Sequence, residues 1–502
     1  MEARRSSDGD LRSCILEGPR CGPFWKQMGP GDPAVFKTVG CINRSGRFDS
    51  CLFRTPMNTL YETLPQVETL LQQPSIEKWF AFISRPIATD VVRTTVEKFR
   101  EQIGLENKAF SFEEIVEACD EVLGVIHDRR LRAVINASGV IIHTNLGRAP
   151  ISKENWEQVR LLNCSYTNLE FDVQKGKRGK RSSFTSVLLT KLSGAEDAIV
   201  VNNNAAAIFL ILSTFAKRKE VIVSRSELVQ IGGGFRIPDI LKSSGAKLVE
   251  VGTTNITTID DYLEAITERT AMVLRVHRSN FALRGFTEEV SVRQLKEHLP
   301  PHLLLVVDQG SGALDRRIPA EITVEQLVAS GADVVSFSAD KALGSVQAGC
   351  IVGREDLIVT LGKHPLFRTM RIGKTVSSLL EASLVDHLNG VDQPTGRLLF
   401  RSMSELEEAG TLIIGKIKSE RLSLLEDTMT LGGGTTPDEN LPSLSICLSS
   451  AKPHKDAETL RLRKIPIITT VHKGAVHLNL GTVMEDELEE VILALTELVE
   501  GR

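Results

Sequence analysis

The stretch VVSFSADKALGSVQAGCIVG, residues 334–353, decides the expected fold of this chain. Its first residues form an apolar run typical of a buried strand, and small residues follow it. Asp340 and Lys341 come next, in a loop that contains Gly344 and Gly349. Lysine is among the residues that are buried least often. A lysine at the end of a core strand, in a loop of small residues that a ligand can approach closely, is therefore a candidate functional residue.

Five further apolar runs precede this stretch, and amphipathic segments of helix length separate them. The runs are AIVV (198–201), VIVS (221–224), KLVEV (247–251), MVLRV (272–276) and LLLVVD (303–308). Strands that alternate with helices predict a parallel sheet with helices on both faces. Ligands of such sheets bind at the carboxyl ends of the strands. The chain places its polar and glycine-rich segments at those ends.

The composition is that of a globular protein, with 42% hydrophobic and 25% charged residues among 502. No window of 18 apolar residues is present, so no membrane span is expected. The net charge of −4 predicts no general attraction to polyanions, so a nucleic acid would have to bind at a local patch. The eight cysteines form no C-x-x-C pair. This pattern favours reduced thiols in a cytoplasmic protein and predicts no metal site.

The first 56 residues differ in character from the rest of the chain. They contain half of the cysteines and no periodic apolar pattern. Met57 is followed at once by NTLYETLPQVETLLQQP (58–74), in which apolar residues recur at helical spacing. We therefore expect residues 1–56 to be a spurious or disordered extension and translation to start at Met57.

The remaining chain is expected to form three domains. Residues 57–128 show helical periodicity throughout, and SFEE at 111–114 is typical of a capping box. Residues 129–384 carry the alternating strands and helices. Residues 385–502 are predicted to form a smaller α+β domain that ends in an amphipathic helix.

Three of the strand ends together meet the requirements of pyridoxal 5'-phosphate. Lys341 can form the Schiff base with the aldehyde of this cofactor. Asp308, at the end of another predicted strand, can keep the pyridine nitrogen protonated. Asn203 and Asn204 can cap a helix that begins at Ala205, whose free backbone N–H groups would receive the phosphate. Each signal alone is weak, because an Asp after a strand is often a helix cap, but the three together favour this cofactor.

Several long motifs resemble the bacterial L-seryl-tRNA(Sec) selenium transferase family, the selenocysteine synthases. They are INASGVIIHTNLGRAP (135–150), GAEDAIVVNNNAAA (194–207), SELVQIGGGFRIPDI (226–240), EVGTTN (250–255), DQGSG (308–312) and SFSADKALGSVQAG (336–349). The similarity spans nearly everything after Met57. It implies pyridoxal-phosphate fold type I, the aspartate-aminotransferase-like α/β fold, with the cofactor on Lys341 and Asp308 as the partner of its pyridine nitrogen. It also implies a homodecamer whose helical N-terminal domain recognises the tRNA.

The chemistry implied by the resemblance is a β-replacement on seryl-tRNA(Sec). Loss of the serine hydroxyl would be followed by addition of selenium from selenophosphate. In the family, arginines at four places line the active site, and the chain has Arg148, Arg181, Arg368 and Arg371 there. Arginine suits an oxyanion because its fork can bind two oxygens at once. Arg368 and Arg371 are three residues apart, so on a helix they would project from one face.

The chain departs from the family pattern near the lysine and in the C-terminal domain. The departures are Ala339, Ser345, Val346, Gly373, Thr470, Lys473, Asn479 and Gly481. Several of these positions carry charged partners in the family, so we expect one ion-pair network to be dismantled here. Two alternatives therefore stay open: a paralogous pyridoxal-phosphate lyase or β-replacement enzyme acting on a small amino acid, and a tRNA-binding protein whose catalysis has lapsed. The helical domain favours the transferase over the first, and the intact lysine, aspartate and arginines disfavour the second.

Overall fold

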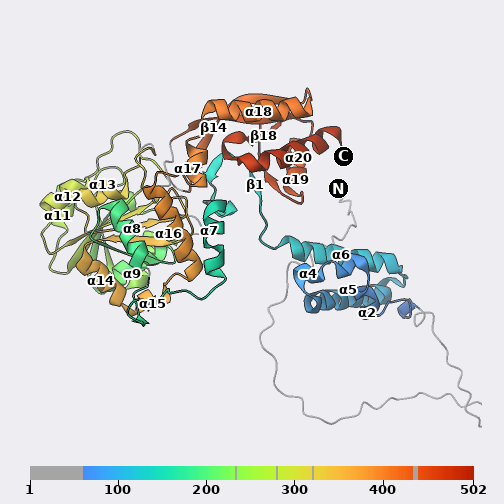
Figure 1. Ribbon diagram of the computed structural model, residues 1–502, viewed down its shortest axis with the longest axis horizontal. Helices are drawn as coiled ribbons and strands as arrows, with labels where there is room; N and C mark the ends of the chain where they lie inside the picture. The colour runs from blue at the N-terminus through green and yellow to red at the C-terminus, as the bar shows by residue number, and fades with distance from the viewer. Residues whose placement is uncertain are drawn as a thin grey trace, which may run out of the picture. The chain divides into compact units, whose positions relative to one another are not determined.

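The computed structural model describes residues 60–181, 183–231, 235–278, 281–318, 321–433 and 439–501 (Figure 1). The extension predicted for residues 1–56 and the start predicted at Met57 lie outside the described residues. The chain divides into two compact units between Arg130 and Leu131. In the described residues, the helices are either too short or too polar to cross a membrane.

The first unit is helical in all its described elements. These are α2 (Val67–Leu71), α3 (Pro74–Glu77), α4 (Phe80–Ile83), α5 (Arg85–Glu106) and α6 (Phe112–Asp128). The predicted capping box is present, because Ser111 Oγ accepts from Glu114 N and Ser111 N donates to Glu114 Oε2. The helices enclose a core of their own, which includes Leu70, Ile76, Val92, Ile115, Cys119 and Leu123.

The second unit is built on a seven-stranded sheet with the order β5-β13-β12-β11-β10-β6-β9. The six predicted runs all form strands: β5 (Asp197–Val201), β6 (Glu220–Ser224), β9 (Lys247–Val251), β10 (Thr270–Val276), β11 (Leu304–Gly310) and β12 (Val334–Ser338). These six strands run in the same direction, as predicted, and the sheet has one further strand, β13 (Gly349–Gly353), which pairs antiparallel with both β12 and β5. Residues 339–348 are too few for the helical crossover that a parallel connection needs.

Helices cover both faces of this sheet, as predicted (Figure 1). On one face lie α8 (Ser183–Ser193), α13 (Val324–Ala329) and α16 (Lys374–Leu388). On the other lie α9 (Asn204–Phe215), α10 (Ile237–Ser244) and α14 (Glu355–Lys363). Successive strand residues point to opposite faces, so Val334 packs into the second of these cores and Val335 into the first. A third cluster packs α11 (Ile259–Glu264) and α12 (Val292–His298) on the sheet.

A second, five-stranded sheet has the order β17-β18-β15-β14-β2. Its strands are β2 (Val140–Ile142), β14 (Leu422–Gly432), β15 (Leu441–Ser449), β17 (Thr470–His472) and β18 (Ala475–Asn479). One face packs on α18 (Met403–Ile417), α19 (Pro453–Arg461) and α20 (Leu488–Glu500). In addition, β1 (Ile135–Asn136) pairs with β16 (Ile467–Ile468). Residues 135–142 therefore pair with strands that lie far along the chain, in the segment predicted as the small domain.

The remaining elements of the second unit belong to neither of the two large sheets nor to the helices named above. They are η1 (Thr144–Leu146), α7 (Lys153–Asn163), β3 (Phe171–Asp172), β4 (Lys177–Arg178), η2 (Arg225–Glu227), β7 (Gln230–Ile231), β8 (Phe235–Arg236), α15 (Pro365–Thr369), α17 (Pro394–Leu399), η4 (Leu480–Thr482) and η5 (Glu485–Glu487).

Candidate active site

Two glycines allow three strand ends of the large sheet to meet. Gly312 has φ +72°, and a Cβ built there would overlap the carbonyl oxygen of Ser338 at the end of β12. A Cβ at Gly349 would overlap the carbonyl oxygen of Asn203, which precedes α9. Only glycine permits these approaches without a backbone shift. The loops after β11 and β12 and the start of α9 are therefore packed against one another.

Lys341 lies in the turn after β12 and is buried, with 6% of its surface exposed. Its side chain forms no hydrogen bond or ion pair with the described residues, and its loop is joined to the segment after β11 by a hydrogen bond from Ala342 N to the carbonyl oxygen of Ser311. Burial, and then the positive charge of Arg148, lower the pKa of its ammonium group, while Asp308 and Asp340 oppose the shift. A buried amine that loses its proton more readily than usual is suited to act as a nucleophile or a base.

Asp308 lies on β11 and is 7% exposed. Its Oδ1 accepts a hydrogen bond of 2.7 Å from Asn204 Nδ2. Burial raises the pKa of its carboxyl group, while Asn204, Lys341 and His277 act in the opposite direction. A cationic partner would stabilise this carboxylate in its buried position.

Two polar atoms beside Asp308 are buried and have no hydrogen-bond partner. They are Asn204 Oδ1 and His277 Nδ1. Buried polar atoms are almost always paired, so atoms without a partner indicate a site for a polar ligand. The buried lysine, the buried carboxylate and these unpaired atoms fit pyridoxal phosphate.

At the start of α9, one of the two predicted capping residues caps the helix and the other does not. Asn203 Oδ1 accepts from Ala206 N at 2.9 Å, so Asn203 caps the helix. The helix begins at Asn204, one residue before the predicted Ala205, and the Asn204 side chain bonds to Asp308 instead of capping. The other amides of the first turn, those of Asn204 and Ala205, have no partner within the helix, which makes this helix start suited to bind an anion.

Of the four predicted arginines, Arg148 contacts the loop of the lysine. Its Nη1 donates to Asp340 Oδ2 at 2.9 Å, and Asp340 directly precedes Lys341. The backbone of Arg148 is in the left-handed region with φ +66°. Ala149 N donates to the carbonyl oxygen of Asp340 at 3.3 Å, which ties the two loops together.

Arg181 and Arg371 meet at a residue that the sequence reading missed, Glu170. Arg181 Nε donates to Glu170 Oε1 at 2.8 Å, and Arg371 Nη1 donates to the same oxygen at 3.1 Å. Arg178 donates to the other oxygen at 2.8 Å. These arginines, Arg181 foremost, hold the pKa of Glu170 below its usual range. Glu170 lies in no recognisable motif, so no local signal in the sequence pointed to it.

The predicted helical face for Arg368 and Arg371 is wrong. Helix α15 ends at Thr369, so Arg368 is on it and Arg371 lies in the segment that follows. The carbonyl oxygen of Met370 accepts from Asn202 N at 2.9 Å, which draws this segment to the start of α9 and out of the helix. Arg368 is exposed and forms no ion pair with a described residue. The structure thus brings Arg181 and Arg371 together and leaves Arg368 apart from that cluster.

Four of the departures from the family pattern can be described by what surrounds them. Ser345 Oγ bonds to Ser383 Oγ at 2.9 Å, and Gly373 is the N-cap residue of α16. Asn479 Oδ1 accepts from Ser443 Oγ at 2.8 Å. A side chain at Gly481 would collide with Met429 and Ser443. Ser345 and Asn479 therefore form hydrogen bonds at two of the positions that depart from the family pattern.

A family profile described as L-seryl-tRNA selenium transferase matches residues 134–484. The chain belongs to this family. Relatives named L-seryl-tRNA(Sec) selenium transferase include one from Sulfurimonas denitrificans, 40% identical over 454 residues, and one from Caldanaerobacter subterraneus, 41% identical over 466 residues. Each match covers 88% of this chain and 99% of the relative. The resemblance read from the motifs is confirmed.

A solved structure shows the same fold. The structure titled D-glucosaminate-6-phosphate ammonia-lyase superposes with a TM-score of 0.56 at 22% identity, over 75% of this chain and 98% of that one. At this identity the match establishes the fold alone. The predicted α/β fold of pyridoxal-phosphate fold type I is confirmed.

The Glu170 cluster yields a prediction about stability. Replacing Glu170 with glutamine is expected to lower the melting temperature at pH 7 by about 2–4 °C. Because the folded-state pKa of Glu170 is below its ordinary value of 4.5, the stabilisation is present above that value and is lost as the pH falls through the folded-state pKa. The difference between the two proteins should therefore vanish in acid, as measured by thermal melts across pH. Glu157→Gln, which removes an exposed ion pair to Arg160, is the control, and an equal effect of both changes would contradict the prediction.

Proposed function

We propose that this chain converts L-seryl-tRNA(Sec) to L-selenocysteinyl-tRNA(Sec), with selenophosphate as the selenium donor. The observation that carries the proposal is the match to transferases of that name over 99% of their length. The buried, unpaired Lys341 agrees with an intact catalytic centre.

The cofactor of the proposed reaction is pyridoxal 5'-phosphate. Lys341 would hold its aldehyde carbon, Asp308 its pyridine nitrogen, and the first turn of α9, capped by Asn203, its phosphate. When bound, this group withdraws electrons and stabilises negative charge on the Cα atom of an amino acid. Asn204 supports it indirectly by orienting Asp308.

The side chains of the site would each have a separate task. Lys341, as a free amine, takes the proton from the seryl Cα, and departure of the β-hydroxyl opens the β-carbon to selenium. Arg148, Arg181, Arg368 and Arg371 are proposed to bind the anionic donor. In the structure Glu170 engages Arg181 and Arg371, so the donor would compete with this carboxylate for the two guanidinium groups.

The first unit is proposed to bind the tRNA, as residues 57–128 were expected to do. Its separate core supports this, because a unit that folds around its own core can present a surface independently of the catalytic sheet. The predicted limits of the other domains, 129–384 and 385–502, and the cytoplasmic location stay proposals.

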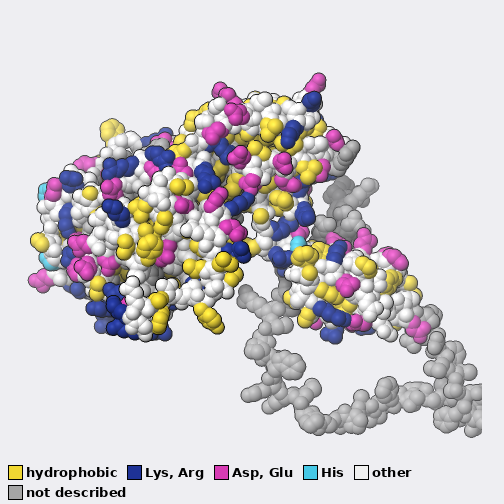
Figure 2. All heavy atoms as spheres, viewed as in Figure 1, with side chains coloured by type: hydrophobic (Ala, Val, Ile, Leu, Met, Phe, Trp, Pro, Cys, Tyr) yellow, Lys and Arg dark blue, Asp and Glu magenta, His cyan; other side chains and the backbone are white. Residues whose placement is uncertain are grey.

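A homo-oligomer, a decamer by the resemblance, is also proposed. Large hydrophobic side chains are exposed on the second unit, including Trp156, Leu161, Leu162, Phe171, Phe184 and Val187. Figure 2 shows hydrophobic side chains on the visible surface of this unit. Exposed apolar side chains concentrated in neighbouring segments are typical of protein interfaces.

The decisive experiment follows the visible absorbance of the purified full chain during titration with seryl-tRNA(Sec) or free serine. The transferase requires that the charged tRNA changes the cofactor band and that free serine does not. Addition of selenophosphate should then yield selenocysteinyl-tRNA(Sec). A response to free amino acids without a response to the tRNA would support the paralogous small-molecule enzyme instead. A chain that binds the tRNA without any change in its spectrum would support lapsed catalysis.

A further inference from the structure

The small sheet has one apolar face and one polar face. Along β15, Leu444, Ile446 and Leu448 pack into the helical core, whereas the alternating residues Ser443 and Cys447 point the other way. These polar-face residues are buried. Buried polar side chains need hydrogen-bond or ligand partners. The chemistry of the side chains on this face therefore indicates which ligand it can bind.

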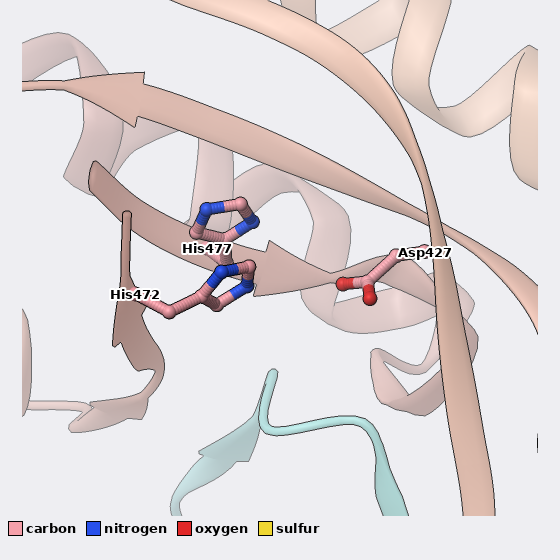
Figure 3. A group of neighbouring side chains, drawn as sticks. All are labelled: Asp427, His472 and His477. Atoms are coloured by element: carbon pink, nitrogen blue, oxygen red, sulfur yellow. The ribbon is translucent and has the colours of Figure 1, made fainter. Parts of the chain in front are cut away.

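Three potential metal ligands gather on this polar face. Asp427 comes from β14, His472 from β17 and His477 from β18, and their side chains point toward one another (Figure 3). One ligand atom from each lies within 4.8 Å of the other two. His477 is 6% exposed, Asp427 is partly buried and His472 is exposed, so solvent reaches the group from one side.

The strand register explains why these residues meet. Thr470 of β17 lies opposite His477 of β18, so His472, two residues further on, is diagonal to His477 on the same face. The two imidazole rings stack with centroids 3.6 Å apart and an interplanar angle of 19°. Cys447 lies opposite His477 on the other side, and its Sγ is 3.9 Å from His477 Nε2.

Neighbouring groups orient the carboxylate of Asp427. Asn479 Nδ2 donates to its Oδ2 at 3.3 Å, and the Ser445 hydroxyl donates to the same oxygen. Thr428 N donates to Oδ1 at 2.8 Å. Hydrogen bonds of this kind to a ligating carboxylate are the usual outer shell of protein metal sites. Oδ2 already accepts two hydrogen bonds, whereas Oδ1 accepts one and keeps a further lone pair for a ligand.

The group offers two imidazoles beside one carboxylate. Metal ions bind the neutral form of histidine. Two imidazoles and one carboxylate form a mixed nitrogen and oxygen ligand set that suits zinc, which also accepts a thiolate.

We propose that Asp427, His472 and His477 bind one zinc ion, with water or the Cys447 thiolate as the fourth ligand. Zinc bonds of about 2.0–2.2 Å to nitrogen and oxygen place neighbouring ligands closer together than 4.8 Å. The exposed His472 side chain, at the edge of the sheet, can rotate to close this gap. The ion would join the edge strand β17 to β14 across β18 and β15 and so stabilise the small sheet.

The test is metal binding to the full chain after dialysis against a chelator. Co²⁺ is the probe, because its absorption bands in a site with nitrogen ligands lie at longer wavelength than the cofactor band, and Zn²⁺ is added as the competitor. We expect one Co²⁺ per chain, displaced by Zn²⁺, and a higher melting temperature with Zn²⁺. Asp427→Asn and His472→Asn should each weaken binding at least about tenfold.

His454→Asn is the matched control, because His454 is an exposed histidine on α19, outside the group. Circular dichroism checks that each variant is folded, and the exposed His472 is the substitution that the fold tolerates best. Absence of stoichiometric Co²⁺ binding to the unaltered chain would overturn the proposal. Binding that His454→Asn weakens as much as His472→Asn would also overturn it.

Discussion

Lys341→Ala is expected to reduce kcat by about 10²–10⁴-fold, the contribution of a positioned general acid or base. The physical reason is that, in the proposed mechanism, the substitution removes both the attachment point for the cofactor aldehyde and the amine that takes the α-proton. Burial and Arg148 lower the pKa of this amine, so no exposed lysine can substitute for it. The measurement is turnover of seryl-tRNA(Sec), together with the visible absorbance of the purified protein.

A control separates this role from a general effect of charge. Lys363→Ala removes an exposed lysine from the last turn of α14 and should leave both turnover and absorbance unchanged. Lys341→Arg keeps a positive charge but lacks the reactive amine, so it should be as inactive as Lys341→Ala. Full activity of either Lys341 variant would show that the lysine is only a loop residue.

Asp308→Asn is expected to lower kcat/KM by about 10²–10³-fold, the usual cost of one preorganised electrostatic partner. The asparagine retains an oxygen that can accept from Asn204 Nδ2, so the local geometry is preserved while the negative charge is lost. In the proposed site, loss of that charge would make the pyridine nitrogen less readily protonated, so that the cofactor would withdraw electrons less strongly.

Asp308→Asn is not expected to lower the stability of the fold. Burial raises the pKa of Asp308, which means that the charged form is costly in the folded chain, so the asparagine variant should melt at the same temperature or higher. Kinetics, cofactor content and thermal melts together make the test. Asp356→Asn, at an exposed position of α14, is the control. Wild-type kinetics in Asp308→Asn with bound cofactor would remove Asp308 from the site.

Local patterns were sufficient to predict the elements and part of the site. Each of the predicted runs forms a strand, because a short apolar run between turn signals is typical of a buried strand. The capping role of Asn203 and the capping box at Ser111 were also predictable, because each depends only on residues within three positions of one another. The motif around Lys341 was long enough to indicate the family, and the profile match confirmed it.

The sequence by itself thus determined the strands, the helix caps, the place of Lys341 after a buried strand and the family of this protein. Only the tertiary structure decided the antiparallel place of β13, the convergence of Arg181 and Arg371 on Glu170, and the meeting of Asp427 with His472 and His477. The physical reason is that strand register and loop packing join residues far apart in the chain. No local periodicity encodes such pairs, so the ligands proposed for zinc match no metal motif and the sequence predicted no metal site.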